Sequence, residues 1–267
     1  MKYMGCAAHK LNLIVEKGLD IQEPVIAKIK RNVTHFKSST KAWNKLIECQ
    51  SQENISTPKK CINSMPTRWN SVYYMVRRFV ELENPIKIAV ALIAPHLPVL
   101  TPDEWKICKS LCVILEPFEE MTLQLSKQGY PPASSVIVMI NGLIELLRGF
   151  RKRDDLSSVF PVIDVLLAEI IKEDRFRNIE SSGTLSTCTF LDPRYKLDGF
   201  NDSRAASNAQ ATVKNLIMEK ISTDQDDNDP KTPTEKMRPV DKISVFDGFV
   251  KRKEAKSGLN KSELAPQ

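Results

Sequence analysis

The chain has little glycine and no long apolar run, and both shortages narrow its fold class. Glycine supplies only 9 of the 267 residues, which is few for a fold that turns between many short strands. No apolar run approaches the roughly 20 residues that a membrane-spanning helix needs, so no membrane partner is expected. Leucine, isoleucine, lysine and glutamate are frequent instead, and they favour helices. The sequence therefore predicts an all-α fold.

Signatures of the common enzyme classes are also missing. The sequence has no glycine-rich phosphate loop, no nucleophile elbow and no kinase or metalloprotease signature. It has six cysteines, but no cysteine pair has a second pair at zinc-finger spacing. No signal peptide is recognisable at the N-terminus, so we expect reduced thiols in the cytosol or nucleus. We predict no catalytic residue, no bound metal, no cofactor and no small-molecule substrate.

Positive charge is concentrated in the first part of the chain. Residues 1–100 contain 15 lysines and arginines against 7 aspartates and glutamates, whereas residues 101–200 contain 12 against 15. A basic region of this kind suits a polyanion such as nucleic acid. It is equally compatible with an ordinary soluble surface.

Apolar periodicity predicts one helical domain at residues 1–221 and a polar, mostly disordered tail at residues 222–267. Gly18 is expected to end the first helix in a left-handed conformation, and Thr101 to Glu104 form a strong helix start. Glu116, Glu119 and Glu120 cluster as on a solvated helix face. The predicted helices cover residues 6–18, 23–36, 41–49, 69–84, 86–93, 105–125, 136–147, 162–177 and 205–221.

The stretch at residues 65–71 is the most informative one, because it joins a polar linker to a long apolar-periodic segment. Two interpretations fit it. In the first, Trp69 stacks on a base, Arg68 binds a phosphate and Asn70 hydrogen-bonds a base edge. In the second, Asn70 or Ser71 caps a helix and Trp69 packs on the core at its entrance. Arg77 and Arg78 follow in the same helix and would neutralise phosphates.

Cys6 and His9 lie three residues apart and so share one helix face. They make half of a zinc site, but only two other histidines, His35 and His96, are present to complete it. The simpler interpretation is a small buried thiol at Cys6 and, at His9, an imidazole that is either hydrogen-bonded or faces a site.

The order of several short stretches resembles that of the hAT superfamily of DNA transposases, and within it the zinc-finger BED-type proteins. The stretches that carry the resemblance are residues 6–13, 33–39, 67–71, 100–105, 114–118 with Thr122, and 190–196. The last of them contains Asp192, Pro193 and Arg194, where Asp192 is expected to cap a helix that begins at Pro193.

The resemblance implies an RNase H-like enzyme interrupted by a helical insertion domain, which is the part that this chain resembles. In such enzymes three carboxylates hold two Mg²⁺ ions. Two of those acids precede the stretch that contains Cys6 and His9, and the third follows in a C-terminal segment. The chain lacks counterparts of all three, and of the BED finger. We therefore expect no strand-transfer activity, and Mg²⁺ only in a full-length active relative.

Three functional hypotheses follow. The first is a catalytically inert, transposase-derived protein that binds DNA or chromatin in the nucleus, with Trp69 stacking as the resemblance implies. The second is a helical scaffold for protein partners. The third is a truncated remnant of an active transposase.

Overall fold

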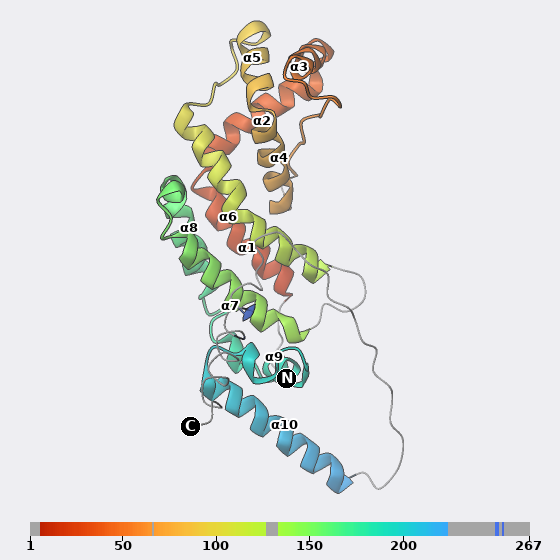
Figure 1. Cartoon of the computed structure of the whole chain (residues 1–267), viewed down its shortest axis with the longest axis vertical. Coiled ribbons are helices and arrows are strands. Elements are labelled where there is room, and N and C mark those ends of the chain that lie inside the picture. The colour runs from red at the N-terminus through yellow and green to blue at the C-terminus, as the bar shows by residue number, and fades with distance from the viewer. Residues whose placement is uncertain (1–5, 66, 127–132, 224–248, 251–252, 254–267) are drawn as a thin grey trace, which may run out of the picture. The chain divides into compact units, whose positions relative to one another are not determined.

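A computed structural model of the chain describes residues 6–65, 67–126, 133–223, 249–250 and 253. Within this part of the chain the regular elements are α-helices and short 3-10 helices, with no strand (Figure 1). The prediction of an all-α fold is confirmed. The predicted disordered tail lies almost wholly outside the described residues.

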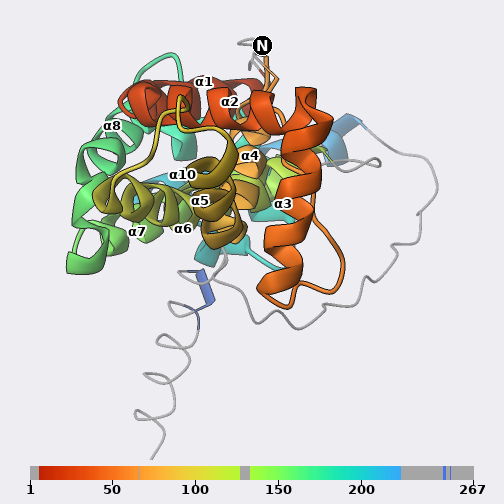
Figure 2. The same cartoon turned by 90° about the horizontal axis from the view of Figure 1, so that it is seen from above.

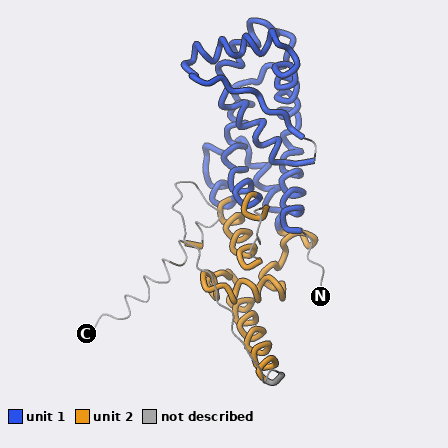
Figure 3. Tube along the Cα trace, turned by 90° about the vertical axis from the view of Figure 1, so that its right-hand side faces the viewer, with its two compact units in different colours: residues 1–122, 147–170 blue, residues 123–146, 171–267 orange. Residues whose placement is uncertain are grey.

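The chain divides into two compact units, coloured separately in Figure 3. Unit 1 comprises residues 1–122 and 147–170, and unit 2 comprises residues 123–146 and 171–267. The predicted division into a domain at residues 1–221 and a tail stays a prediction.

Unit 1 is built on a long first helix that meets a partner from much later in the chain. Helix α1 packs against α8, α2 packs against α3 and α4, and α3 packs against α5. Figure 2 shows α1 and α2 following one another and α3 running at a steep angle to them from the end of α2. The helices are α1 (Ala7–Asp20), α2 (Glu23–Ser38), α3 (Thr40–Gln52), α4 (Trp69–Glu81), α5 (Glu83–Ile93), most of α6 (Pro102–Ser126), η1 (Asp154–Val159) and α8 (Phe160–Ile170).

Unit 2 is organised around α9, which contacts the two short 3-10 helices and α10. Its elements are most of α7 (Ala133–Phe150), η2 (Ile179–Ser181), α9 (Gly183–Leu191), η3 (Lys196–Gly199) and α10 (Ser203–Thr223). Among the described helices, α7 alone has the length and composition to cross a membrane, contrary to the expectation that no run comes close. It is 67% buried, as is typical of a core helix.

Local capping signals in the sequence predict several helix starts correctly. The backbone N–H of Thr101 donates to the Glu104 carboxylate over 2.9 Å, and the backbone N–H of Glu104 donates to the Thr101 hydroxyl over 3.2 Å. This reciprocal pair is a capping box. The hydroxyl of Ser39 likewise accepts from the backbone N–H of Ala42 at the start of α3.

The prediction that the first helix ends at Gly18 is wrong. It lies inside α1, which continues to Asp20, and it does not adopt a left-handed terminating conformation. A Cβ at this position would lie 2.7 Å from Leu166 Cδ2 and 3.4 Å from Val162 Cγ1. Glycine is therefore required here by the close approach of α1 to α8, rather than by a turn.

Candidate nucleic-acid interface

Trp69 is the first residue of α4 and lies in the core of unit 1. Its side chain is 2% exposed. The indole contacts the Phe118 ring edge-on at 6.4 Å between centroids and lies 6.2 Å from the Tyr73 ring. Base stacking needs a free aromatic face, and burial leaves none in this conformation. The predicted stacking role is not supported by this geometry, which matches the interpretation that Trp69 packs at the helix entrance.

The start of α4 is held from outside the helix, which corrects the predicted cap. Neither Asn70 nor Ser71 is the N-cap, because Arg68 occupies that position without a side-chain cap. The backbone N–H of Trp69 donates instead to the side-chain amide oxygen of Asn12, in α1, over 3.3 Å. The Ser71 hydroxyl donates to the Arg68 carbonyl over 2.7 Å. The first backbone N–H groups of a helix have no acceptor within the helix, so a group outside it must accept their hydrogen bonds.

Asn70 connects α4 to a buried carboxylate on α6. Its amide and the Tyr74 hydroxyl both donate to the carboxylate of Glu119, which is 6% exposed. Burial raises the pKa of Glu119 above its ordinary value, and the Asn70 hydrogen bond partly opposes that rise. The expectation that Glu119 sits on a solvated face is therefore wrong, because α4 covers it.

The three predicted phosphate-binding arginines do not share one place. Arg68 is exposed at the N-terminal end of α4, and no carboxylate among the described residues pairs with it. Arg77 and Arg78 lie near the opposite end, about 13 Å further along the helix axis at 1.5 Å per residue.

A compact cluster of cations surrounds Glu81 at the C-terminal end of α4. We call Lys59, Lys60, Arg77 and Arg78 the basic cluster. Three of its members approach the Glu81 carboxylate, Lys59 at 3.3 Å, Arg78 at 3.0 Å and Arg77 at 4.0 Å. Arg78 also donates to the Lys60 carbonyl over 2.8 Å, which fixes the preceding loop to α4. Three cations thus share the Glu81 carboxylate, and the fourth, Lys60, has no carboxylate partner among the described residues, which leaves a local surplus of positive charge.

An aromatic side chain borders the basic cluster. The ammonium of Lys60 lies 5.6 Å from the centroid of the Trp43 ring, a cation–π distance. Trp43 is partly exposed, unlike Trp69 and Trp105, which are 2% and 3% exposed. Sequence reasoning missed this neighbour because Trp43 and Lys60 belong to separate segments, α3 and the loop before α4.

Cys6 and His9 are both exposed at the first turn of α1, so neither packs in the core. Across the described residues there is no group of three or more histidine, cysteine, aspartate or glutamate side chains that could hold a metal ion. The simpler interpretation of a small buried thiol at Cys6 is wrong, since Cys6 is the exposed N-cap residue of α1.

Asp192 and Arg194 form a separate polar site in unit 2. The Arg194 guanidinium donates to both carboxylate oxygens of Asp192, over 3.0 and 2.7 Å, and the Ser134 hydroxyl donates to the same carboxylate over 2.7 Å. These donors hold the pKa of Asp192 down, to about 2. Asp192 does not cap a helix beginning at Pro193, because residues 193–195 form a turn before η3. Its carboxylate instead accepts from the backbone N–H of Arg194 within that turn.

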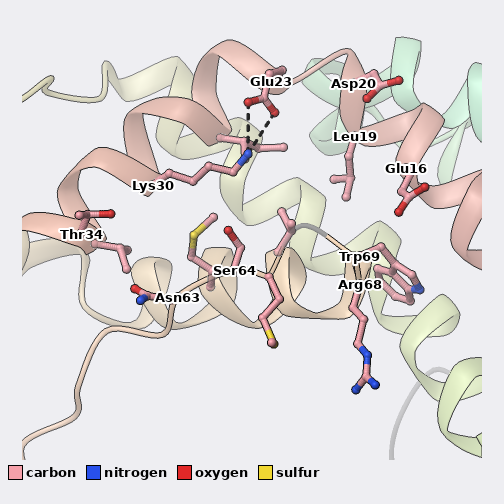
Figure 4. A pocket seen from close by; sticks show the side chains of 15 residues that line it. Glu16, Leu19, Asp20, Glu23, Lys30, Thr34, Asn63, Ser64, Arg68 and Trp69 are labelled. Carbon is pink, nitrogen blue, oxygen red and sulfur yellow. Dashed lines mark hydrogen bonds and ion pairs between the residues drawn. The ribbon is translucent and has the colours of Figure 1, made fainter. Parts of the chain in front are cut away.

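A groove of about 440 Å³ opens beside the Trp69 stretch, between α1, α2 and the segment before α4. We call it the acidic groove, because the carboxylates of Glu16, Asp20 and Glu23 line it (Figure 4). Met65 and Arg68 line the facing wall. In Figure 4 the Glu23 carboxylate is paired with Lys30, at 3.2 Å.

Comparison with known proteins links the chain to transposases. Residues 4–114 match the family described as the ZBED1 RNase-like helical domain. The chain is 29% identical over 197 residues to a putative AC transposase of Zea mays and 39% identical over 226 residues to a putative AC9 transposase of the same species. It is 26% identical over 228 residues to human zinc finger BED domain-containing protein 4.

These matches cover most of this chain but a small part of each relative. They span 73%, 73% and 82% of the chain, and 24%, 26% and 18% of the two transposases and the human protein, respectively. No solved structure matches the chain.

Proposed function

Because the chain belongs to the hAT-type family of transposases and transposase-derived BED proteins, we propose that it binds DNA without itself cleaving it. The observation that carries the proposal is the basic cluster of unit 1, where three cations surround Glu81 and the fourth, Lys60, lies over a partly exposed indole. Its local charge has the sign that a phosphate backbone requires.

The physical basis for binding is the release of condensed counterions. Each phosphate that a lysine or arginine neutralises frees cations from the DNA, so affinity falls steeply as salt is added. Lys59, Lys60 and Arg77 are exposed. Lys59 and Arg77 can exchange the shared Glu81 carboxylate for phosphate oxygens, and the Lys60 ammonium can bind a phosphate directly. Arg78 is less exposed and holds the loop, so its role combines positioning with charge.

The residues first singled out take different parts in this proposal. Arg68 remains a candidate phosphate contact because it is exposed and lies outside every ion pair described. Trp69 and Asn70 act by fixing the start of α4 that presents Arg68. The partly exposed Trp43, which Lys60 overlies, is the indole available to nucleic acid in this conformation.

The test removes three cluster cations and leaves Arg78 in place. The variant Lys59→Ala/Lys60→Ala/Arg77→Ala should bind a fluorescein-labelled 20-base-pair duplex at least about tenfold more weakly at low salt. The slope of log affinity against log salt concentration should become shallower by up to about 3, at roughly 0.9 per phosphate contact. Fluorescence anisotropy at several salt concentrations measures both.

A control with the same loss of charge separates the cluster from the net charge of the chain. Lys17→Ala/Lys87→Ala/Lys109→Ala removes three exposed cations of unit 1 that pair with Asp20 or Glu83. This variant should keep most of the affinity and of the salt slope. Equal losses in the two triple variants would contradict the proposal.

Absence of cleavage and a nuclear location are parts of the same proposal. Incubation of the chain with supercoiled plasmid and Mg²⁺ should leave the plasmid intact. A nicking activity that follows the wild-type chain through every purification step would contradict this. A fluorescent fusion of the chain should accumulate with DNA in the nucleus of a transfected cell. A fusion that stays in the cytoplasm would contradict the nuclear assignment.

A further inference from the structure

We propose that the acidic groove binds an extended peptide segment of a protein partner, in which a lysine or arginine stands next to a large apolar side chain. This site is separate from the basic cluster and does not depend on DNA binding. The proposal rests on the shape of the groove, the charge of its rim and the free backbone groups along one wall.

The groove offers an apolar floor of the size that peptide side chains fill. At about 440 Å³, it falls within the range of ordinary ligand sites. Leu19, Ile26 and Val33 line it from α1 and α2. Met65 stands at its edge and is 61% exposed. An exposed methionine beside an apolar floor adapts its shape to a partner side chain.

Acidic side chains outnumber basic ones along the groove, where Glu16, Asp20 and Glu23 face Lys30 and Arg68. Residues 1–100 contain seven acidic residues, and three of them, Glu16, Asp20 and Glu23, line this one groove. The carboxylates lie on α1 and α2 and disfavour a phosphate on that side, whereas Arg68 belongs to the opposite wall. A lysine or arginine of a peptide would be attracted.

The carboxylates are available for a new partner. The side chains of Asp20 and Glu23 are 66% and 56% exposed, and within the described part of the chain each forms an ion pair with one exposed lysine, at 3.2 Å in both cases. Exposed ion pairs of this kind contribute little to stability, so an incoming cation can replace Lys17 or Lys30 at small cost. Glu16 accepts a hydrogen bond from Asn12 over 2.7 Å, which fixes its position at the rim.

The wall opposite α1 favours an extended occupant. Asn63 and Ser64 line the groove in a segment without helix or strand. Among the described residues, no backbone hydrogen bond involves either of them. An extended peptide that runs alongside can supply these bonds, as in strand addition. Arg68 lies on the same wall (Figure 4), and its guanidinium can donate to a peptide carbonyl.

The experiment selects peptides without assuming a sequence. A phage-displayed library of random octapeptides is panned against the whole chain, and the most enriched peptide is synthesised with a fluorescent label. We expect enriched sequences to carry lysine or arginine within three positions of Leu, Ile, Met or Phe. Affinity for the labelled peptide should fall at least about tenfold in Asp20→Lys/Glu23→Lys and several-fold in Met65→Ser.

A matched control distinguishes an effect of the groove on peptide binding from an effect of the net charge of the chain. Glu48→Lys/Glu53→Lys makes the same charge change at the end of α3, outside the groove, and should bind the peptide like the wild type. Circular dichroism confirms that each variant is folded.

Three results would overturn the proposal: no enrichment above background, equal peptide binding by both double variants, or displacement of the peptide by duplex DNA. The last would assign the groove to the nucleic-acid surface. Loss of DNA binding in the basic-cluster variant would leave peptide binding unchanged, so the two proposals fail separately.

Discussion

In unit 1 the Trp69 stretch is hydrogen-bonded to the carboxylate of Glu119, and in unit 2 the Asp192 stretch carries its own carboxylate. The pKa values of these two carboxyl groups are shifted in opposite directions. Glu119 is buried and accepts from two neutral donors, Asn70 and Tyr74. Asp192 accepts from a guanidinium, a hydroxyl and a backbone N–H. Burial without a cation raises the pKa of Glu119, whereas the Arg194 pair lowers the pKa of Asp192 to about 2.

The difference shows what each stretch contributes to its unit. At the Asp192 site the carboxylate is paired with the Arg194 guanidinium, and this pairing stabilises the ionised form of Asp192. At Glu119 the ionised form is disfavoured, and the stability of the region comes from the aromatic packing of Trp69 and Phe118 beside it. The stability of unit 1 around Glu119 therefore depends on aromatic packing, whereas the stability of unit 2 around Asp192 depends on an ion pair.

The largest effect is expected from removing the indole on which unit 1 depends. Trp69→Ala should lower the free energy of unfolding by about 3–5 kcal/mol, the usual cost of truncating a buried tryptophan. Urea titration followed by tryptophan fluorescence measures this change. Trp43, Trp69 and Trp105 all lie in unit 1, so the two remaining indoles report on that unit.

Trp43→Ala is the matched control, because that side chain is only partly buried. It should cost clearly less stability than Trp69→Ala but should weaken DNA binding more. A Trp69→Ala variant with wild-type stability and impaired DNA binding would restore the stacking role and contradict the packing interpretation.

A smaller effect is expected from removing the charge in unit 2. Asp192→Asn should lower the free energy of unfolding at pH 7 by about 1–2 kcal/mol. A pKa lowered from 3.8 to about 2 corresponds to somewhat more than 2 kcal/mol, reduced here because Arg194 is 53% exposed. Urea titration followed by circular dichroism measures the loss.

The pH dependence of the same site follows from the sign of the shift. A lowered pKa stabilises the fold above the unfolded value of 3.8, and this contribution disappears as the pH falls from 3.8 to about 2. Asp192→Asn should lack this acid-dependent step. Asp202→Asn is a suitable control, because Asp202 also accepts from the backbone N–H two residues ahead, over 2.9 Å. A step that persists in Asp192→Asn would contradict the assignment.

The smallest effect, with the opposite pH dependence, is expected at Glu119. Its raised pKa means that the protein loses stability as the pH rises from the ordinary value of 4.5 through the raised pKa of the folded state. Glu119→Gln should remove that loss. At pH 7 the net change should be on the order of 1 kcal/mol or less, because Asn70 and Tyr74 donate to different oxygens of Glu119 and one of these becomes an NH2 group in glutamine. Denaturation midpoints between pH 4 and pH 8 measure it, and parallel curves for the two proteins would contradict the prediction.

Much of the helical pattern could be predicted from local sequence. The helix predicted at residues 23–36 is observed at Glu23–Ser38, and the helix predicted at residues 205–221 is observed at Ser203–Thr223. These segments carry strong apolar stripes or local start signals. Helix α9 was missed because its sequence, rich in threonine and serine, has weak helix propensity and depends on tertiary contacts.

The candidate site was less predictable, because its decisive contacts join distant residues. Trp69 and Asn12 are 57 residues apart, and Asn70 and Glu119 are 49 apart. Each residue could be singled out by type, but only the fold decides whether a tryptophan faces the core or the solvent. Trp43 and Lys60 meet for the same reason, and no spacing rule points to that pair.

The close approach of Gly18 to Leu166 also has a consequence for the synthesis of the chain. These residues are 148 positions apart, so α1 leaves the ribosome long before α8 exists. At roughly 5–20 residues per second, the interval is about 7–30 s. During that time the face of α1 that carries Gly18 lacks its final neighbour. A nascent chain stalled before residue 160 would therefore present this face to chaperones, and one released beyond residue 170 would have it covered.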